Sequence, residues 1–441
     1  MRTARRILAV GITAVLLAAG CTDPAGPDGE TPVQLLLFGA PEELAAYRTL
    51  VTAYERARPG GRVQSVEASD RADLITRLAT SIAGGEPPDV FLMNYRFYGQ
   101  FAAKGAIEPL DERLRSSTVV KAADLYPTAV EAFRWRGQQL CMPQNVSSLA
   151  VYFNRDLFAR YGVPEPKSGW TWNDMVAAAA ALTRDANGVA VVGTETEGTR
   201  QRVATYGLGV EPSIIRLAPF VWSNGGEIVD NPLRPTRFTL DTAESREALR
   251  NLVDLRRRYG VVPTDEEVEA EADEPRFVNG RLAMLLSSRR STTTFRTIKS
   301  FDWDVAPLPI YDRQVGILHS DAYCITRGSR NKDAAWRFVE YAMSAEGQRI
   351  IAATGRTVPS NMDASRSAAF LDPTVPPRRA RVFLDAIPTV RAMPTVSTWP
   401  EIEDVVAGLL ENALYRGDDL DTVVREIDQQ TRPLFARAEN P

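Results

Sequence analysis

Few side chains in this sequence could do covalent chemistry by themselves. His319 is the only histidine in 441 residues, and Cys141 and Cys324 are the only cysteines after position 21. The patterns HExxH, GxSxG and GxxxxGK do not occur, so the usual motifs of zinc peptidases, serine hydrolases and P-loop nucleotide-binding proteins are missing from the sequence. No recognisable nucleophile motif accompanies His319. We therefore expect no catalytic residue, no metal site and no cofactor.

The carboxylates leave an enzymatic alternative open. Two of the 56 Asp and Glu residues, held roughly 5 to 9.5 Å apart, could act as the paired carboxylates of an extracellular glycoside hydrolase. A ligand-sensing protein that signals to a receptor is a further alternative.

The acidic tract at 265–274 lacks the glycine and ligand spacing of a calcium loop, and we interpret it as a solvated helix end or loop. The net charge of −4 does not indicate the excess of positive charge that is typical of nucleic-acid-binding proteins, so we expect no nucleic-acid partner.

The N-terminal segment predicts export from the cytoplasm. Three arginines within the first six residues precede an apolar run at 7–19, which is the layout of a secretory signal peptide and too short for a membrane span. The run ends in LAAGC, which resembles the lipobox of bacterial lipoproteins. We predict a signal peptide at 1–20, lipidation of Cys21, and a polar tether at 21–32 that holds the protein at the outer face of the cell membrane. An ordinary secretory signal that happens to contain a cysteine is the alternative.

The elements that would position a site alternate along the first part of the chain. Segments at 33–38, 62–68 and 89–93 are strand candidates, the first of them a continuous apolar run, and apolar residues at helical spacing lie between them. This βαβαβ order predicts a parallel sheet with ligands at the carboxyl ends of its strands, in the loops after Phe38 and Met93. Further helices are predicted at 175–183, 243–259, 332–353 and 401–415, and further strands at 149–153 and 282–286.

Several separated segments resemble the extracellular solute-binding proteins of family 1, the carbohydrate-binding components of ABC importers that are similar to maltose-binding protein. The matching segments are GGEPPDV at 84–90, MP at 142–143 followed by VYFNRDLF at 151–158, TWNDM at 171–175, NGGE at 224–227, FVNGRLAM at 277–284 and DAAWRFV at 333–339. These segments occur in the order and spacing of the family. They extend over nearly the whole chain after the tether.

The resemblance implies an α/β, two-lobe periplasmic-binding-protein-like fold. Each lobe would be discontinuous in sequence: lobe one at 33–142 and 288–330, lobe two at 144–287 and 331–441. The lobes would be joined by a hinge of two or three crossing segments and would close on a ligand. This topology brings Cys141 and Cys324 towards the hinge side of lobe one, where we hypothesise a disulfide. Two separate buried thiols are the alternative.

The resemblance also implies a function without catalysis: a monomer that captures a carbohydrate or related small polar solute and delivers it to the membrane permease of an ABC importer. Aromatic faces and planar polar groups suit such a ligand. The candidate ligand-binding residues are Asn94, Tyr95, Asn145, Trp222, Asn224, Arg289, Arg290, Ser320, Asp321, Arg356 and Trp399. Core packing is the alternative for the aromatic residues, and salt bridges at the surface or hinge are the alternative for the polar ones. The sequence SSRR at 287–290 and HSDA at 319–322 replace the Gly and Trp that the family often has there, which favours a polar or charged ligand.

Overall fold

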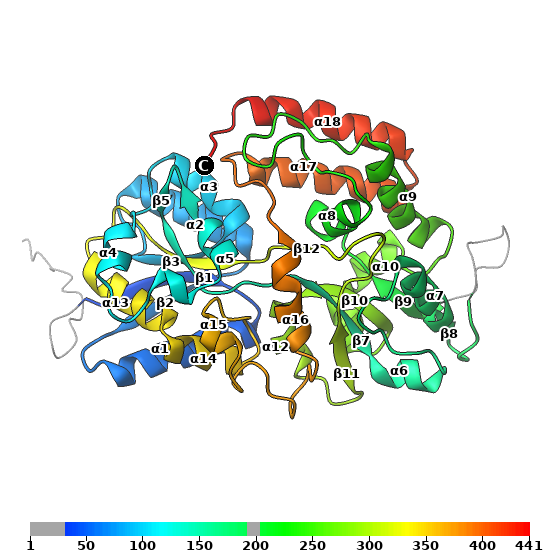
Figure 1. The fold of residues 1–441 in the computed structure, drawn as a ribbon, viewed down its shortest axis with the longest axis horizontal. Coiled ribbons are helices and arrows are strands. Elements are labelled where there is room, and N and C mark those ends of the chain that lie inside the picture. The colour runs from blue at the N-terminus through cyan, green and yellow to red at the C-terminus, as the bar shows by residue number, and fades with distance from the viewer. Residues whose placement is uncertain (1–30, 192–202) are drawn as a thin grey trace, which may run out of the picture.

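The computed structural model describes residues 31–191 and 203–441. These residues form two α/β lobes that lie side by side, each around a five-stranded sheet (Figure 1). The two-lobe fold predicted from the sequence is therefore confirmed. The predicted signal peptide, the lipidation site Cys21 and most of the tether lie outside the described residues. Within the described ranges, no helix is both long and apolar enough to cross a membrane.

Lobe one is the lobe built on the sheet with strand order β2-β1-β3-β13-β6. β1 is parallel to β2 and β3, as the βαβαβ pattern predicts, whereas β13 runs antiparallel to both β3 and β6. The strands are β1 (Val33–Phe38), β2 (Val63–Ala68), β3 (Val90–Asn94), β6 (Cys141–Pro143) and β13 (Asp321–Ile325). The helices are α1 (Pro41–Ala57), α2 (Arg71–Gly84), α3 (Tyr95–Ala103), α4 (Asp111–Ser116), α5 (Pro127–Glu131), α13 (Lys332–Met343) and α14 (Ala345–Ala353).

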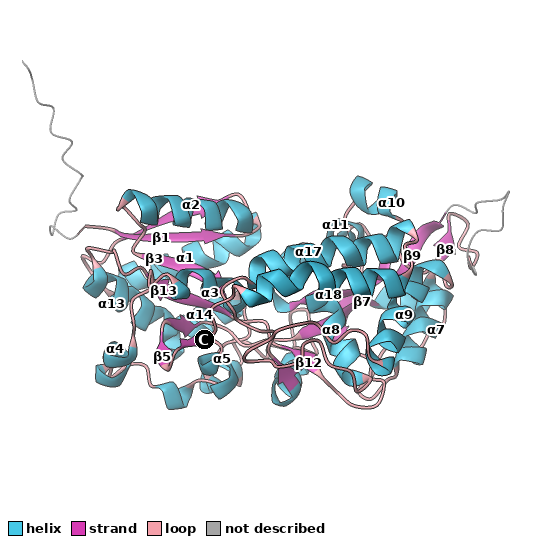
Figure 2. Ribbon diagram, turned by 90° about the horizontal axis from the view of Figure 1, so that it is seen from above, coloured by secondary structure: helices cyan, strands magenta, loops and turns pink. Residues whose placement is uncertain are grey.

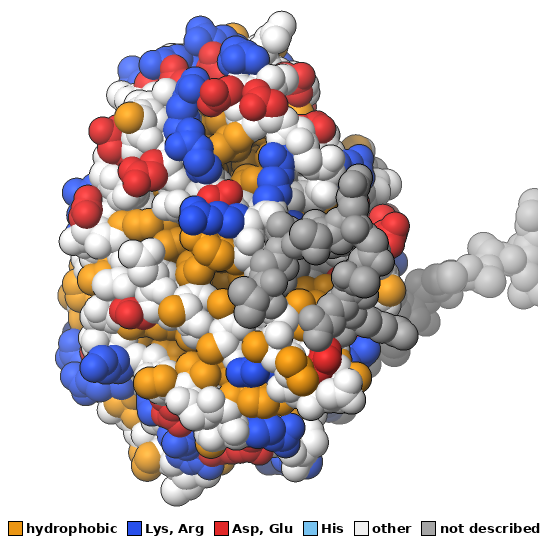
Figure 3. All heavy atoms as spheres, turned by 90° about the vertical axis from the view of Figure 1, so that its right-hand side faces the viewer, with side chains coloured by type: hydrophobic (Ala, Val, Ile, Leu, Met, Phe, Trp, Pro, Cys, Tyr) orange, Lys and Arg blue, Asp and Glu red, His pale blue; other side chains and the backbone are white. Residues whose placement is uncertain are grey.

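Lobe two is the lobe built on the sheet with strand order β11-β7-β10-β9-β8. β7 pairs antiparallel with β10 and β11, and β9 lies parallel to β10. The strands are β7 (Leu149–Asn154), β8 (Arg184–Asp185), β9 (Val203–Gly209), β10 (Leu282–Ser288) and β11 (Trp303–Ala306). The helices are α6 (Arg155–Arg160), α7 (Trp172–Leu182), α8 (Ile214–Ser223), α9 (Ala243–Arg257), α10 (Asp265–Ala270) and α11 (Asp273–Val278). Figure 3 shows charges of both signs interspersed with hydrophobic side chains on the outer end of this lobe.

Two segments lie in the other lobe from the one that the sequence analysis assigned. β11, within the predicted lobe-one range 288–330, pairs with β7 of lobe two. Helices α13 and α14, within the predicted lobe-two range 331–441, pack on α1 and the lobe-one sheet, where Trp336 and Phe338 join the same hydrophobic cluster as Leu35. Strand pairing and apolar burial decide these positions. Sequence order does not reveal them, because the chain crosses between the lobes more than once.

The hinge contains three extended segments, and the segment at 144–148 pairs with both of the others. Ser147 exchanges both backbone hydrogen bonds with His319, with N···O distances of 2.9 and 2.8 Å. On the other side of residues 144–148, the backbone N–H of Val146 donates to the carbonyl of Val358 at 3.1 Å. Residues 144–148 and 317–321 thus cross between the lobes, and residues 357–361 lie along the first of them as the third segment of a narrow antiparallel strip. This arrangement confirms a hinge of two or three crossing segments, and it allows the lobes to rotate about few backbone bonds.

A C-terminal helical hairpin, α17 (Trp399–Glu411) and α18 (Leu420–Ala436), lies across both lobes (Figures 1 and 2). α17 packs against α3 of lobe one and α8 of lobe two. The chain approaches α3 closely before this hairpin, since a Cβ on Gly99 would stand 2.4 Å from the carbonyl oxygen of Thr395. The remaining short elements are β4 (Arg134–Trp135), β5 (Gln138–Gln139), α12 (Thr292–Phe295), β12 (Gly316–Ile317), α15 (Met362–Ser365), α16 (Arg381–Ala386) and β14 (Val390–Arg391).

A disulfide joins Cys141 to Cys324. The two residues are direct partners on the neighbouring strands β6 and β13, and their Cα atoms are 4.3 Å apart. Both side chains are fully buried. The bond fastens the last strand before the first crossing to the strand that follows the return from lobe two. It is the arrangement that the sequence analysis hypothesised.

Candidate ligand-binding site

A cavity of about 330 Å³ lies between the lobes, at the carboxyl ends of their strands. Lobe one contributes side chains from the loops and first helical turns after β1, β2 and β3, and lobe two contributes those after β9 and β10. The hinge closes one side. The polar and charged lining residues are Glu43, Arg71, Asn94, Arg96, Asn145, Ser147, Glu211, Arg216, Ser288, Arg289, Arg290, His319, Asp321 and Arg356. This volume is at the low end of the range of small-molecule sites, roughly 300–1,000 Å³.

The lobe-one wall is formed by the N-terminal turns of α2 and α3. Asn94 caps α3, since its Oδ1 accepts from the backbone N–H of Arg96 at 3.2 Å. Arg96 forms a buried ion pair with Glu403 of α17, and its guanidinium lies 4.8 Å from the ring centre of Phe97. Arg71, the first residue of α2, lies over the same ring at 4.4 Å. The ring of Phe97 therefore lies close to two arginines at this wall.

The hinge wall is a hydrogen-bonded group of side chains from two hinge segments and from the end of β3. Asn94 Nδ2 donates to Asp321 Oδ1 at 3.1 Å, and Asn145 Oδ1 accepts from the backbone N–H of Asp321 at 2.6 Å. Ser320, which the sequence analysis also selected, turns away from the cavity and donates to the backbone carbonyl of Asn145 at 2.6 Å. These bonds hold the carboxylate of Asp321 and both amides in fixed positions. Such pre-organisation lowers the cost of binding polar ligand groups.

A group of charged residues joins α1 to the hinge. Arg356 Nε lies 3.0 Å from Glu43 Oε1, and Arg356 Nη2 lies 3.8 Å from Asp321 Oδ2. Arg290 reaches Glu43 only at 3.7 Å. Burial would lower the pKa of Arg356, but the nearby Tyr47, Glu43 and Asp321 raise it above the ordinary value, so Arg356 carries its charge at all physiological pH values.

The lobe-two wall is formed by the segment between β9 and α8. Glu211 follows β9, and Arg216 lies in the first turn of α8, with Nε 3.3 Å from Glu211 Oε2. The Arg216 side chain is 11% exposed and its Nη1 has no hydrogen-bond partner in the described part of the chain. Burial lowers the pKa of Arg216, and Arg290 and Arg96 lower it further, against the opposing effect of Glu211. This wall therefore presents the guanidinium of Arg216, whose positive charge is only partly balanced by neighbouring residues.

His319 lies at the hinge, and its Nε2 is buried without a hydrogen-bond partner among the described residues. Its pKa is far below the ordinary value, first because of burial and then because of Arg216, Arg96 and Arg290. The imidazole is therefore neutral at pH 7. A neutral ring offers a ligand one donor and one acceptor.

Arg289 contributes to the cavity wall, but its guanidinium points elsewhere. It lies 4.8 Å from the ring centre of Phe370 and 5.3 Å from that of Phe383, and the residue is 1% exposed. None of its three guanidinium nitrogens has a hydrogen-bond partner in the part of the chain described. Burial lowers the pKa of Arg289 to about 9, so it remains mostly protonated at pH 7. The two rings stabilise this buried cation.

The structure brings together some of the predicted site residues and separates others. Six of the eleven candidates line the cavity, namely Asn94, Asn145, Arg289, Arg290, Asp321 and Arg356. Tyr95, Trp222, Asn224, Ser320 and Trp399 do not line it. A position near a strand end or near the expected hinge does not determine where a side chain points.

Each of the aromatic candidates has a packing role instead. Tyr95 is fully buried, and its hydroxyl accepts from the backbone N–H of Met393 at 3.0 Å. Trp222 is 3% exposed and lies under the guanidinium of Arg391. Trp399 is fully buried in the core beneath the C-terminal hairpin. Packing was the stated alternative for these residues.

Asn224 ends α8 rather than entering the cavity. Its Nδ2 donates to the backbone carbonyl of Glu244 at 2.9 Å, so it ties α8 to the start of α9. This contact lies at the opposite end of α8 from Arg216. The next residue, Gly225, has a φ of 85°, which allows the chain to turn after the helix.

Six charged or titratable lining residues were missed by sequence reasoning: Glu43, Arg71, Arg96, Glu211, Arg216 and His319. The first five lie in the loop or first helical turn that follows β1, β2, β3 or β9. That position is a usable signal, because the carboxyl ends of strands form the ligand-binding edge of an α/β sheet. His319 was not selected, because one histidine without a recognisable motif carries no signal of its own.

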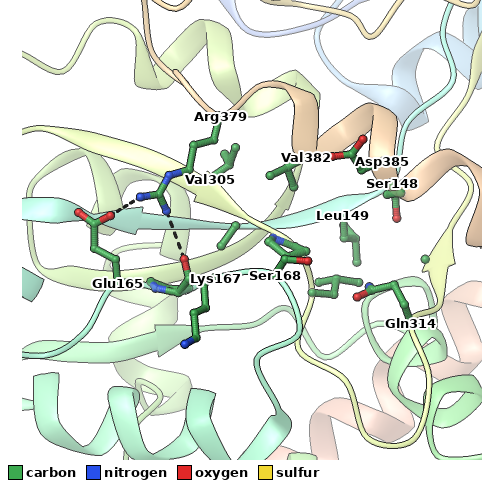
Figure 4. Close-up of a pocket in the computed structure, with 16 residues that line it drawn as sticks. Ser148, Leu149, Glu165, Lys167, Ser168, Val305, Gln314, Arg379, Val382 and Asp385 are labelled. Atoms are coloured by element: carbon green, nitrogen blue, oxygen red, sulfur yellow. Dashed lines mark hydrogen bonds and ion pairs between the residues drawn. The ribbon is translucent and has the colours of Figure 1, made fainter.

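A second cavity, of about 390 Å³, lies on the lobe-two side of the hinge (Figure 4). Its main charged groups satisfy each other, because Arg379 pairs with Glu165 and also donates to the carbonyl of Pro166. None of the eleven predicted ligand-binding residues lines it. The cleft between the lobes is therefore the better candidate site. Two lobes, a narrow hinge and a polar cleft between them are the arrangement of a two-lobed solute-binding protein.

Comparison with known proteins agrees with this class. The model of the bacterial extracellular solute-binding protein family matches residues 40–349, so the chain belongs to this family. The resemblance stated from the sequence is confirmed. A putative binding protein of Brucella abortus is 20% identical over 384 aligned residues, which cover 85% of this chain and 86% of that protein.

Two solved structures show the same fold. The chain matches an ABC substrate-binding protein from Listeria monocytogenes in complex with cycloalternan, with a TM-score of 0.82 and 24% identity over 92% of this chain and 99% of that chain. It also matches an ABC transporter solute-binding protein from Thermotoga lettingae bound with α-D-tagatose, with a TM-score of 0.77 and 18% identity over 92% and 100% of the two chains. At these identities the likeness concerns the fold.

Proposed function

We propose that this protein captures a carbohydrate or related small polar solute in the cleft between its lobes and delivers it to the permease of an ABC importer. The observation that carries this proposal is the cavity of about 330 Å³, which draws polar side chains from both lobes and from the hinge. A solute that touches both walls favours the closed state by its additional contacts there. The two solved structures described above contain bound carbohydrates, which are cycloalternan in one and α-D-tagatose in the other.

The ion pairs of the cleft favour binding over hydrolysis. A glycoside hydrolase needs a carboxylic acid whose pKa is raised, so that it can protonate the leaving oxygen. Partial desolvation in the cleft would raise the pKa of Glu211, but Arg216 and other neighbours bring it below the ordinary value. Glu43 lies beside Arg356 and Arg290, and Asp321 is fixed by Asn94. These pairings support reversible capture, with release of an unaltered solute.

The proposal includes the location of the protein outside the cytoplasm. Membership of an extracellular family supports it, together with the arginine-flanked apolar run at 7–19. We further propose that Cys21 carries the lipid anchor and that one chain acts as a monomer at the outer face of the cell membrane. Radiolabelled palmitate incorporation into the natural chain, and its loss in Cys21→Ala, would test the anchor.

A thermal-shift screen over mono- and oligosaccharides tests the function, followed by calorimetry and mass spectrometry for every hit. A solute at 100 times its dissociation constant stabilises the fold by about 2.7 kcal/mol, which is easily measured. We expect one solute molecule per chain, recovered without change in mass. Release of a hydrolysis product by catalytic amounts of protein would contradict the proposal and favour the glycoside hydrolase.

A further inference from the structure

The charges that line the cleft are unequal. Six arginines line it, Arg71, Arg96, Arg216, Arg289, Arg290 and Arg356, against three carboxylates, Glu43, Glu211 and Asp321. Arg96 is compensated by Glu403 from behind the wall, and the guanidinium of Arg289 lies among aromatic rings. The remaining question is which guanidinium groups have free donors that face the solute.

Three arginines have the weakest partners. Arg71 has no hydrogen bond or ion pair in the described part of the chain and is held only over Phe97. Arg216 Nη1 lacks a hydrogen-bond partner there, as noted above. Arg290 has its nearest carboxylates, Glu43 and Glu274, at 3.7 and 4.0 Å, which is longer than a hydrogen bond. These three groups come from opposite walls of the cleft, Arg71 from lobe one and Arg216 and Arg290 from lobe two.

The surroundings of His319 agree with an excess of positive charge at the hinge side of the cleft. The charged groups that depress the pKa of His319, after burial, are Arg216, Arg96 and Arg290. All of them are cations. Burial and these cations together favour the neutral imidazole, and the cations give a positive electrostatic potential at that point. A positively charged solute would meet the same potential and be disfavoured.

We propose that the solute captured by this protein is an anionic carbohydrate, one that carries a carboxylate or phosphate group, and that Arg71, Arg216 and Arg290 bind this group. The inference rests on the proposed function, and it names the class of solute. Guanidinium groups bind carboxylate and phosphate through paired, charge-assisted hydrogen bonds. Asn94, Asn145 and Asp321 then remain for the hydroxyl groups of the sugar.

The same arrangement gives the anion a role in closure. Arginines on facing lobes repel each other across the cleft, so their repulsion opposes closure while the cleft is empty. An oxyanion between Arg71 and Arg216 replaces this repulsion by two attractions that exist together only in the closed state. A solute contributes to closure only through such differential contacts.

Calorimetry on the mature protein tests this inference with matched pairs of probes. The neutral probes are D-glucose and D-galactose, and the anionic probes are D-glucuronate, D-galacturonate and the 6-phosphates of both sugars. We expect an anionic member to bind at least tenfold more tightly than its neutral parent. The uronates and the phosphates distinguish the two sources of charge. Raising the salt concentration should weaken binding of the anionic member and leave any neutral binding unchanged.

Two variants and one control assign the effect to residues. Arg216→Gln and Arg71→Gln should each weaken the anionic probe about tenfold or more and leave its neutral parent nearly unaffected, because hydrogen bonds to charged groups contribute that much. Arg71 is exposed, so its variant should fold even if a change at Arg216 disturbs α8. Arg77→Gln is the control, because Arg77 is an exposed residue of the same helix that pairs with Asp73 and does not line the cleft.

The outcomes separate this inference from the proposed function. Neutral sugars that bind as tightly as their anionic derivatives would overturn the anionic class and leave carbohydrate capture intact. Inorganic phosphate that binds as tightly as the sugar phosphates would show an anion site without sugar recognition and would also overturn it. Failure of all probes, with the neutral oligosaccharide panel binding, again refutes only the inference. Failure of both panels on folded protein would contradict the proposed function itself.

Discussion

Reduction of the disulfide between Cys141 and Cys324 should destabilise lobe one by an amount that depends on how the lobes unfold. The two cysteines are 183 residues apart in sequence, and the intervening chain contains all five strands of lobe two. A disulfide stabilises a fold mainly because it restricts the unfolded chain, and the effect grows with the length of the closed loop. The length of the loop that the disulfide closes therefore depends on whether the two lobes unfold together or separately.

Two limiting values follow. If both lobes unfold together, the loop is the full 183 residues and reduction should cost about 5 kcal/mol. If lobe two stays folded while lobe one unfolds, Ser147 and His319 remain paired. The two hinge segments that lead to Cys141 and Cys324 then stay close together. The loop then behaves as one of about 15 residues, and reduction should cost about 3 kcal/mol.

Urea unfolding of the oxidised and reduced protein, followed by tryptophan fluorescence, measures this difference. The double variant Cys141→Ala/Cys324→Ala is the control, and it should resemble the reduced protein after allowance for the loss of two buried sulfur atoms. A single shifted transition indicates joint unfolding, and two transitions indicate separate lobes. If reduction changed the free energy of unfolding by less than about 1 kcal/mol, the loop-entropy reasoning would be wrong for this protein.

Three further predictions concern packing and charge. Gly207→Ala in β9 should lower the free energy of unfolding by about 3 kcal/mol or more, because the new Cβ would stand 2.0 Å from a backbone oxygen of α7. Gly408→Ala in α17 has open space around the new Cβ and should raise the free energy of unfolding by up to about 1 kcal/mol through helix propensity. Denaturant unfolding of both variants checks this, and equal effects would contradict it. Asp273→Asn should stabilise the protein above pH 7 by up to about 3 kcal/mol, because burial, and then Glu211, raise the pKa of Asp273 to about 6 in the folded state. The gain should disappear below about pH 4, where the carboxyl is protonated in both states, and a gain that is independent of pH in thermal unfolding would refute this cause. Glu403→Gln should cost about 3–5 kcal/mol, because it leaves the buried Arg96 without its ion pair, while replacing both residues by apolar ones should cost much less. A double-mutant cycle measures the coupling, and additive effects of the two single changes would rule it out.

The sequence predicted the elements well where a continuous apolar run is bounded by turn residues. The strand at 33–38 is found with the same limits, and the helix at 243–259 is found as α9 (Ala243–Arg257). The helix predicted at 332–353 is divided into α13 and α14 at Ser344, whose side chain caps the second helix by accepting from Gly347 N–H. The apolar pattern continues across this break, so periodicity alone does not reveal it.

The candidate site was predictable to the extent that polar residues follow strand ends or lie in the hinge. Asn94, Asn145 and Asp321 fulfil this condition and line the cleft. The orientation of a side chain depends on packing between distant segments, which no local pattern contains. Tyr95 illustrates this, because it lies beside Asn94 in sequence yet points into the core to meet Met393. Arg96, its other neighbour, lines the cleft, and its partner Glu403 is 307 residues away.

Small-angle X-ray scattering with and without the bound solute tests the central claim, that the lobes close on a solute in the cleft between them. The measurement should use the solute that calorimetry identifies, at a concentration that saturates the protein. We predict a smaller radius of gyration in the bound state, because rotation about the three hinge segments brings the two sheets together. The same measurement on Arg71→Gln at equal solute concentration should show a smaller change. An unchanged radius of gyration at saturation, or disappearance of the solute during the measurement, would contradict capture by lobe closure.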